Sequence, residues 1–183
     1  MGIQKVDADE IAQNAAELFR ERGYYGTTMA QVADACGLLK GSLYHHFPGK
    51  EALAIDVLER THSHFYENIF VITRHDAEDP KVTWEAMLQA IEDYFLETRG
   101  CLMAAIGLEV SNDEPRFRSL IQHFFAEWVE VFSDLLAPIY GRKKAITQAQ
   151  DLVIQIEGAV MWLHICDDPA PLKRIRKAAV ALM

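Results

Sequence analysis

Cysteine is scarce in this 183-residue chain, and the three that occur, Cys36, Cys101 and Cys166, are an odd number without metal-ligand spacing. A disulfide framework or a cysteine-based zinc site is therefore not expected. The sequence also lacks a run of about 18 uncharged apolar residues and the basic and apolar sections of a signal peptide. We expect a cytoplasmic protein with reduced thiols and no membrane segment.

Strand patterns are also lacking, because apolar residues recur at spacings of three and four rather than in alternation. The sequence therefore predicts an all-α protein of about nine helices. The first expected helix ends before Gly23, where a C-terminal cap fits. The later ones are expected over residues 29–36, 40–47, 50–73, 81–98, 101–110, 115–137, 144–166 and 170–182.

Positive charge is in the minority, since the formal net charge is −9. Most of the excess acid lies after residue 50: residues 1–50 carry five basic and six acidic side chains, whereas residues 51–183 carry 13 and 21. Residues 37–50 hold two lysines, two histidines and no carboxylate. A local positive segment of this kind suits nucleic acid, although the acidic total disfavours a non-specific architectural DNA-binding protein.

Two short helices joined by a glycine-containing turn follow the first helix, as in a helix-turn-helix unit. Thr28 and Gln31 fit a capping box at the start of the earlier one, and Gly37 ends it. On the later helix we expect Leu39, Leu43 and Phe47 to point inward. The remaining side chains are hydrogen-bond donors suited to phosphates and base edges. They are Lys40, Ser42, Tyr44, His45 and His46.

Several motifs of this segment together resemble the TetR family of bacterial repressors. They are Thr27-Thr28 through Val32-Ala33, Gly37, the segment 40–47 and the run 50–53. The resemblance covers roughly residues 8–58 and implies a DNA-binding domain over 1–50, joined by a connecting helix over 50–73 to a ligand-sensing and dimerisation domain within 51–183. It implies phosphate contacts by Thr28, Tyr44, His46 and Lys50, and a base-facing group of Lys40, Gly41, Ser42 and His45. Leu38 and Leu39 either contact thymine methyl groups or pack internally.

The second half is rich in aromatic and thioether side chains, which suit an apolar ligand pocket but equally suit a core. The residues proposed to line a pocket are Trp84, Phe95, Cys101, Met103, Phe124, Trp128 and Trp162. A ligand bound in the 81–166 bundle is expected to shift the connecting helices and release the operator, and the resemblance favours repression over activation.

Cys101 follows Gly100 at an expected helix start, where the positive end of the helix dipole favours thiolate. The run Gly100-Cys101-Leu102 also resembles the family's electrophile-sensing members of the N-ethylmaleimide reductase repressor type. Two interpretations stay open. Cys101 is either a reactive sensor whose modification releases DNA or a small buried side chain.

The last two expected helices suggest a homodimer surface over residues 144–183. Gly158 is small enough for close helix approach, and the other expected surface residues are apolar: Ala145, Ala149, Leu152, Val153, Ile156, Ala159, Val160, Leu163, Leu172, Ile175, Ala179 and Leu182. The alternative is burial within one chain. A two-fold dimer would place the two expected 40–47 helices on the half-sites of a palindromic operator.

A small helical enzyme using Cys101, or His164 with Asp167 and Asp168, is the rival from another class. Neither a nucleophile–base–orienter spacing nor a phosphate loop is recognisable. The sequence therefore predicts a DNA-binding regulator that is not an enzyme and that has no catalytic residue, metal or cofactor. Its partners are expected to be operator DNA, a second copy and a small-molecule effector whose identity the sequence does not reveal.

Overall fold

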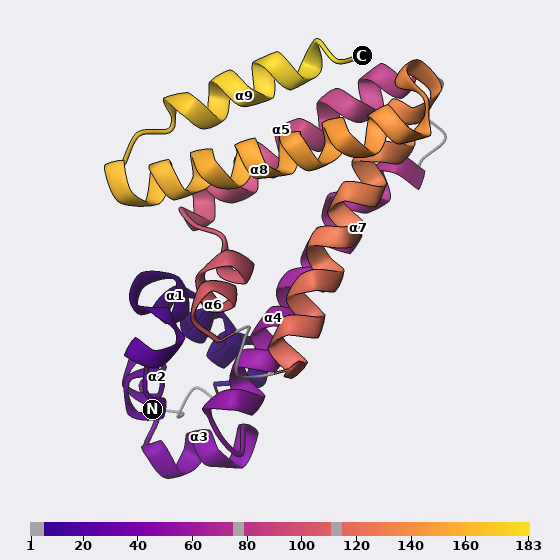
Figure 1. The fold of residues 1–183 in the computed structure, drawn as a ribbon. Coiled ribbons are helices and arrows are strands. Elements are labelled where there is room, and N and C mark those ends of the chain that lie inside the picture. The colour runs from indigo at the N-terminus through magenta and orange to yellow at the C-terminus, as the bar shows by residue number, and fades with distance from the viewer. Residues whose placement is uncertain (1–5, 75–78, 111–114) are drawn as a thin grey trace. The chain divides into compact units, whose positions relative to one another are not determined.

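The computed structural model describes residues 6–74, 79–110 and 115–183. Within these ranges every regular element is helical, which confirms the predicted all-α class (Figure 1). The elements are α1 (Ala8–Gly26), α2 (Met29–Ala35), α3 (Lys40–His46), α4 (Lys50–Asn68), the 3₁₀ helix η1 (Phe70–Arg74), α5 (Pro80–Thr98), α6 (Leu102–Val110), α7 (Pro115–Tyr140), α8 (Arg142–Cys166) and α9 (Ala170–Val180).

Contacts along the chain divide it into two compact units. The first unit runs to Thr61 and includes Leu102–Ile121, and the second comprises His62–Cys101 and Gln122–Met183. The helices α4 and α7 each contribute residues to both units. No helix in the described part of the chain is long and apolar enough to cross a membrane.

In the first unit α1 packs against α2 and α6, and α2 packs against α3. The Asp7 carboxylate begins α1 by accepting hydrogen bonds from the backbone N–H groups of Asp9 and Glu10. The predicted capping box is present at α2, with Thr28 and Gln31 each accepting from the other's backbone N–H. Leu43 and Phe47 are buried as predicted.

The prediction for Leu39 is wrong, because its side chain is 81% exposed. Leu39 precedes the first turn of α3 and has extended backbone (φ −70°, ψ 142°), so its side chain does not follow the inward stripe of the helix. Its backbone carbonyl accepts hydrogen bonds from the N–H groups of Ser42 and Leu43 and thereby starts α3. Leu39 therefore adds an apolar side chain to the surface of this helix.

A turn near the end of α1 connects it to α6. Gly23 has φ +73°, which kinks α1, and this conformation favours glycine. A Cβ at Gly23 would overlap the carboxylate of Glu109, whose Oε2 accepts a 2.8 Å hydrogen bond from the backbone N–H of Tyr25. The ring of Tyr24 is buried and lies 5.4 Å from that of Phe117. Residues of α6 and early α7 thus complete the first unit.

The second unit is built around a cluster of buried rings. Phe65 lies within 4.8 to 6.0 Å, centroid to centroid, of several of its neighbours. Those neighbours are Phe70, Tyr94, Phe95, Phe124 and Trp128. Trp84 packs edge-on to Phe132 and donates its Nε1–H to the backbone carbonyl of Ala179, which joins α5 to α9.

The predicted ends of α4 and α7 differ from the structure by several residues. The helix predicted over 50–73 ends at Asn68, whose side-chain amide donates to the carbonyl of His64. The chain then continues as the 3₁₀ helix η1, and Phe70 packs into the ring cluster. The α7 helix extends to Tyr140, three residues past the predicted end, and therefore contains Pro138 in its last turn. Gly141, with φ +76°, follows the helix and provides the stop.

The predicted dimer stripe on α8 is buried within a single chain. All eight of its apolar residues, from Ala145 to Leu163, face the interior of the second unit, as do Leu172 and Ala179 of α9. They are core residues because α8 packs along α9 in the same chain. A different stripe of α8, at spacings of three and four, is exposed and apolar. It consists of Ile154, Gly158, Met161 and Ile165.

We predict that Gly23→Ala lowers the free energy of unfolding by about 2 kcal/mol. Alanine is unfavourable at the positive φ of this position, and its Cβ would displace the Glu109 carboxylate. Gly141→Ala is the matched control, since Gly141 has φ +76° but open space around a Cβ. It should cost about 1 kcal/mol. In urea titrations, the excess cost of Gly23→Ala should vanish in a Glu109→Ala background; an excess that persists there would contradict the overlap.

Candidate nucleic-acid interface and sensing core

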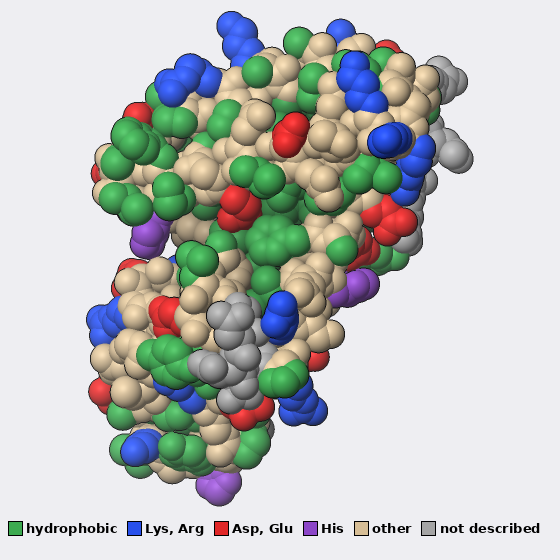
Figure 2. Space-filling view, viewed as in Figure 1, with side chains coloured by type: hydrophobic (Ala, Val, Ile, Leu, Met, Phe, Trp, Pro, Cys, Tyr) green, Lys and Arg blue, Asp and Glu red, His purple; other side chains and the backbone are tan. Residues whose placement is uncertain are grey.

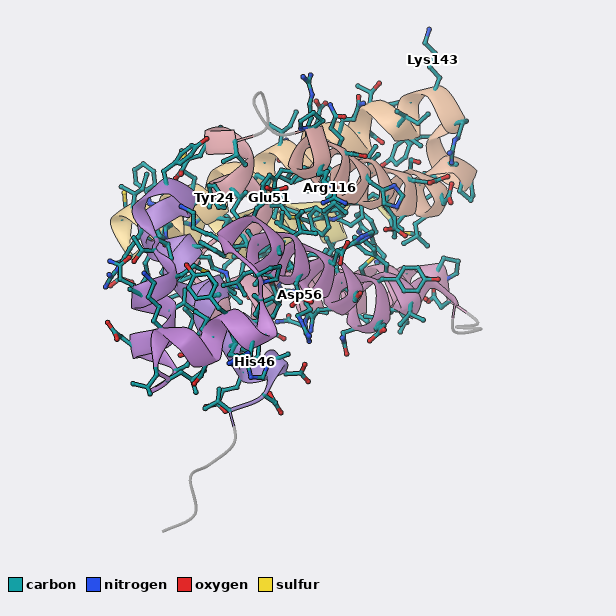
Figure 3. The ribbon with its side chains drawn as sticks, turned by 90° about the horizontal axis from the view of Figure 1, so that it is seen from below. Tyr24, His46, Glu51, Asp56, Arg116 and Lys143 are labelled. Atoms are coloured by element: carbon teal, nitrogen blue, oxygen red, sulfur yellow. The ribbon has the colours of Figure 1, made fainter. Side chains whose placement is uncertain are left out.

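The α3 helix presents a row of unpaired donors to the surrounding solvent. Lys40, Tyr44, His45 and His46 are exposed, and Ser42 is partly exposed. Among the residues that the structure describes, these five side chains make no hydrogen bond or ion pair. Figure 3 views the first unit from the α3 side, with His46 labelled. The row is therefore free to meet phosphates and base edges.

Two other residues shape this surface. A Cβ placed at Gly41 would meet nothing within 4 Å, so the backbone of α3 is open to close approach by another molecule at this point. Leu39 stands beside Lys40 with most of its side chain exposed, which leaves it available for apolar contact with a thymine methyl group. Of the two roles that the sequence left open for Leu39, its exposure favours the contact.

Thr28 is exposed while its hydroxyl caps α2, 3.3 Å from the backbone nitrogen of Gln31. The start of α2 has its free N–H groups and its positive dipole end at this residue, which suits a phosphate. The Thr28 hydroxyl also donates its single proton to Oε1 of Gln31, at 3.0 Å, so the predicted phosphate contact by this hydroxyl would require that hydrogen bond to open.

Lys50 is held inside the first unit more firmly than the sequence suggested. Its Nζ donates to the backbone carbonyls of Tyr24 (2.9 Å) and Thr27 (3.1 Å) and lies 4.3 Å from the centroid of the Tyr24 ring. Burial lowers the pKa of this ammonium, an effect that the nearby Glu109 carboxylate partly opposes. One of its three donors is left for a phosphate. Lys50 thus stabilises the turn between α1 and α2 within the first unit.

The structure brings four of the proposed pocket residues together and leaves three apart. Trp84, Phe95, Phe124 and Trp128 are completely buried in the ring cluster of the second unit. Met103 is buried in α6 of the first unit, and Trp162 is exposed on α8, where its Nε1–H donates to Asp168. Cys101 is buried at the junction before α6.

Trp128 carries an unusual feature for a core residue. Its side chain is fully buried, yet its Nε1–H has no hydrogen-bond partner among the described residues. Buried indole N–H groups usually find an acceptor, and leaving one unpaired costs about 1 to 3 kcal/mol. An unpaired donor surrounded by aromatic rings would suit a flat, apolar ligand that carries an acceptor such as a carbonyl oxygen.

Cys101 and Glu157 form a polar pair inside the second unit. The thiol hydrogen-bonds to the Glu157 carboxyl, and burial raises the pKa of Glu157 to about 7 against this opposing effect. The Oε1 atom of Glu157 is enclosed and has no partner in the described part of the chain. Cys166, in contrast, is an exposed free thiol. The role of Glu157 could not be predicted from the sequence, because nothing in the local pattern of α8 shows that its carboxyl is enclosed.

The residues of the rival enzymatic interpretation do not assemble into a catalytic group. The Nδ1 of His164 lies 3.1 Å from the backbone oxygen of Arg99. Asp167 pairs with the Arg99 side chain, and Asp168 accepts from Trp162 and from the backbone N–H of Ala170. Each of these carboxylates is therefore engaged with a neighbour other than His164.

Two family models match separate parts of the sequence. The N-terminal model, "Bacterial regulatory proteins, tetR family", matches residues 6–57, which include α2, α3 and Lys50. The C-terminal model, "Transcriptional regulator LmrA/YxaF-like, C-terminal domain", matches residues 80–178 and so covers more than half of the chain. This chain belongs to the TetR family. The family prediction made from the helix-turn-helix motifs is confirmed.

Relatives of the TetR-family chain match along most of its length. It is 28% identical to the HTH-type transcriptional regulator LmrA of Bacillus subtilis over 172 residues, 91% of each protein. It is 27% identical to the HTH-type transcriptional repressor DhaR of a Mycobacterium species, covering 88% of this chain and 84% of that protein. These relatives are transcriptional regulators.

Solved structures share the fold. A TetR transcriptional regulator from Legionella pneumophila aligns over 100% of both chains with a TM-score of 0.85 at 19% identity. The reduced form of Escherichia coli NemR aligns over 96% of both chains with a TM-score of 0.74 at 21% identity. At these identities the two comparisons show the fold alone.

We predict that Glu157 makes the second unit less stable as pH rises. Its pKa is raised in the folded state, so its contribution is complete below about pH 4.5, the ordinary value, and is lost as pH rises through about 7. The free energy of unfolding should fall by up to about 3 kcal/mol across this window. Urea titrations from pH 4.5 to 8 should show this fall in the native protein and a flatter profile in Glu157→Gln; parallel profiles would contradict the assignment.

Proposed function

We propose that this TetR-family protein is a dimeric repressor that binds a palindromic operator through α3 and leaves it when an apolar or aromatic effector enters the ring cluster of the second unit. The observation that carries this proposal is the row of unpaired donors on α3, within a segment that matches the DNA-binding domain of the family. Operator binding would take place in the cytoplasm, where the bacterial chromosome lies.

The residue roles follow from exposure and chemistry. We assign base-edge contacts to Lys40, Ser42 and His45, with Gly41 allowing close approach. Thr28, Tyr44 and His46 contact phosphates, and they fix the register of α3 in the major groove. The third donor of Lys50 adds a further phosphate contact. The acidic total charge of the chain weakens non-specific binding, so these contacts carry a large share of the affinity.

Repression, rather than activation, is supported by the relative DhaR, which is described as a transcriptional repressor. An effector that binds more tightly to the form with displaced α3 helices shifts the equilibrium away from the DNA-bound form. The size of the shift is set by the difference between the effector's binding free energies for the two forms. The continuous helix α4, with Lys50 in the first unit and Phe65 in the ring cluster of the second, is the element through which such a shift would pass.

An apolar effector is favoured over thiol modification. The unpaired Nε1–H of Trp128 offers an acceptor-bearing ligand a hydrogen bond that the described side chains around it do not supply. Cys101 is buried and engaged with Glu157, whereas a thiol reagent would meet the exposed Cys166 first. Cys101 therefore acts in this proposal as part of the wall around the effector.

The dimer surface that we propose is the exposed face of α8 and α9. It consists of the stripe Ile154, Gly158, Met161 and Ile165 together with a groove that Trp162 and Ile175 line. Figure 2 shows hydrophobic side chains gathered where the end of α8 meets the start of α9. A helix that is apolar on both faces is typical of one buried on both. A second copy would cover this face by a two-fold contact.

We predict that Lys40→Ala and Tyr44→Ala each weaken operator binding by about tenfold or more, because each removes a direct contact. Lys143→Ala is the charge-matched control, since Lys143 extends from α8 into solvent (Figure 3). Fluorescence anisotropy on the DNA upstream of the protein's own gene measures the affinities at near-physiological salt. Lys40→Ala binding as tightly as Lys143→Ala would contradict the assignment of α3. Lys50→Ala is not diagnostic, because it also releases the turn after α1.

We predict that the protein sediments as a dimer at micromolar concentration and that Met161→Glu sediments as a monomer, because an unpaired charge would be buried in the interface. Gln122→Glu introduces a charge at an exposed position of α7 and should leave the dimer intact. Analytical ultracentrifugation makes the comparison. A monomeric native protein, or a Met161→Glu dimer of native affinity, would count against the α8–α9 surface.

A further inference from the structure

Three side chains of the kinds that bind metal ions meet in the second unit, outside the interior of the ring cluster. His62 comes from α4, and His123 and Glu127 come from α7. One ligand atom from each residue lies within 4.8 Å of those of the other two. Positions 123 and 127 are neighbours on one face of a helix, since residues four apart project from the same side. The fold supplies the third ligand from a segment far away in the sequence.

The contacts within this cluster are close and partly shielded from solvent. The Nε2 of His62 lies 2.5 Å from Oε2 of Glu127, and both side chains are 22% exposed. The rings of His62 and His123 meet edge to face, with centroids 5.2 Å apart. The His62 ring also lies 6.0 Å from the ring of Phe124, so one side of the cluster is apolar.

A simple His–Glu pair accounts for two of these residues and leaves the third unexplained. His123 is exposed and makes no hydrogen bond to the described residues, yet its ring is directed against that of His62. Two imidazole nitrogens and one carboxylate oxygen form the donor set of open zinc sites, which complete their coordination with water. Mg²⁺ and Ca²⁺ prefer oxygen ligands, and this cluster offers one carboxylate.

We propose that His62, His123 and Glu127 bind a divalent first-row transition-metal ion, with Zn²⁺ as the representative. Tetrahedral bonds of about 2.0 to 2.2 Å put ligand atoms about 3.3 to 3.6 Å apart. The three ligand atoms lie within 4.8 Å of one another, and we expect side-chain rotation that opens the His62–Glu127 contact and draws His123 inward to bring them to this separation. The exposed side of His123 leaves room for a water ligand. This site goes beyond the proposed function and does not depend on it.

The metal would join α4 to α7 within the second unit, because its ligands come from both helices. An ion that binds the folded chain and has no comparable site in the unfolded chain stabilises the fold by mass action. Metal binding and thermal stability therefore report on the same event, and neither measurement requires operator DNA or an effector.

The test uses untagged, chelator-treated protein in which Cys166 is replaced by serine, because an exposed thiol is itself a soft metal ligand. Calorimetric titration with Zn²⁺ should show one equivalent bound, and Co²⁺ should produce visible absorption bands without the thiolate-to-metal charge-transfer bands. His123→Ala should weaken Zn²⁺ binding by more than about tenfold, since even losing an outer-shell partner costs about 10- to 100-fold.

Two further variants keep the test decisive. His64→Ala removes an exposed histidine from α4 outside the cluster and should bind Zn²⁺ as the parent does. Glu127→Gln retains a hydrogen-bonding group beside His62 but loses the charge, and should bind at least about tenfold more weakly. Zn²⁺ should raise the melting temperature of the parent and His64→Ala only. No stoichiometric binding by the parent, or His123→Ala binding as His64→Ala does, would overturn the proposal and leave a simple His–Glu pair.

Discussion

The position of the exposed α3 surface depends on the contact between the Lys50 ammonium and the turn that follows α1. Lys50 opens α4, and its Nζ binds the carbonyls of Tyr24 and Thr27 just before α2 begins. Glu109 of α6 holds the same turn through the N–H of Tyr25. A charge-assisted hydrogen bond is stronger than a neutral one, so a single cation and a single carboxylate fix the relative positions of α1, α4 and α6. The orientation of α3 in the first unit follows from them.

The second unit has the opposite character, because its interior is apolar with a few polar atoms left unpaired. The ring of Phe65 packs against those of Phe124 and Trp128, and each aromatic side chain brings a large apolar contribution. Within this core, the indole N–H of Trp128 and the Oε1 of Glu157 have no partner among the described residues. Such atoms reduce stability in the free protein, and a ligand that pairs them recovers that loss.

Much of the fold could be predicted from the sequence, because helices are set by local patterns. The capping box at Thr28, the glycine at position 23 and the three-four spacing gave helix ends within a few residues. The side of a helix that faces a neighbour was harder to predict. On α8 both faces are apolar, so the pattern could not distinguish the core stripe from the exposed stripe around Met161. The pairing of His62 with residues of α7 depends on tertiary packing and has no local signal.

In the proposed function, a symmetric pair of α3 helices binds a specific operator. This can be tested by selecting the sequences that the full-length protein binds from a random pool of double-stranded DNA. We expect an enriched palindrome whose half-sites lie about 34 Å apart or a multiple of that distance. The enrichment should disappear with the Lys40→Ala, Tyr44→Ala double variant. An enriched motif without two-fold symmetry, or no enrichment over the starting pool, would contradict the claim.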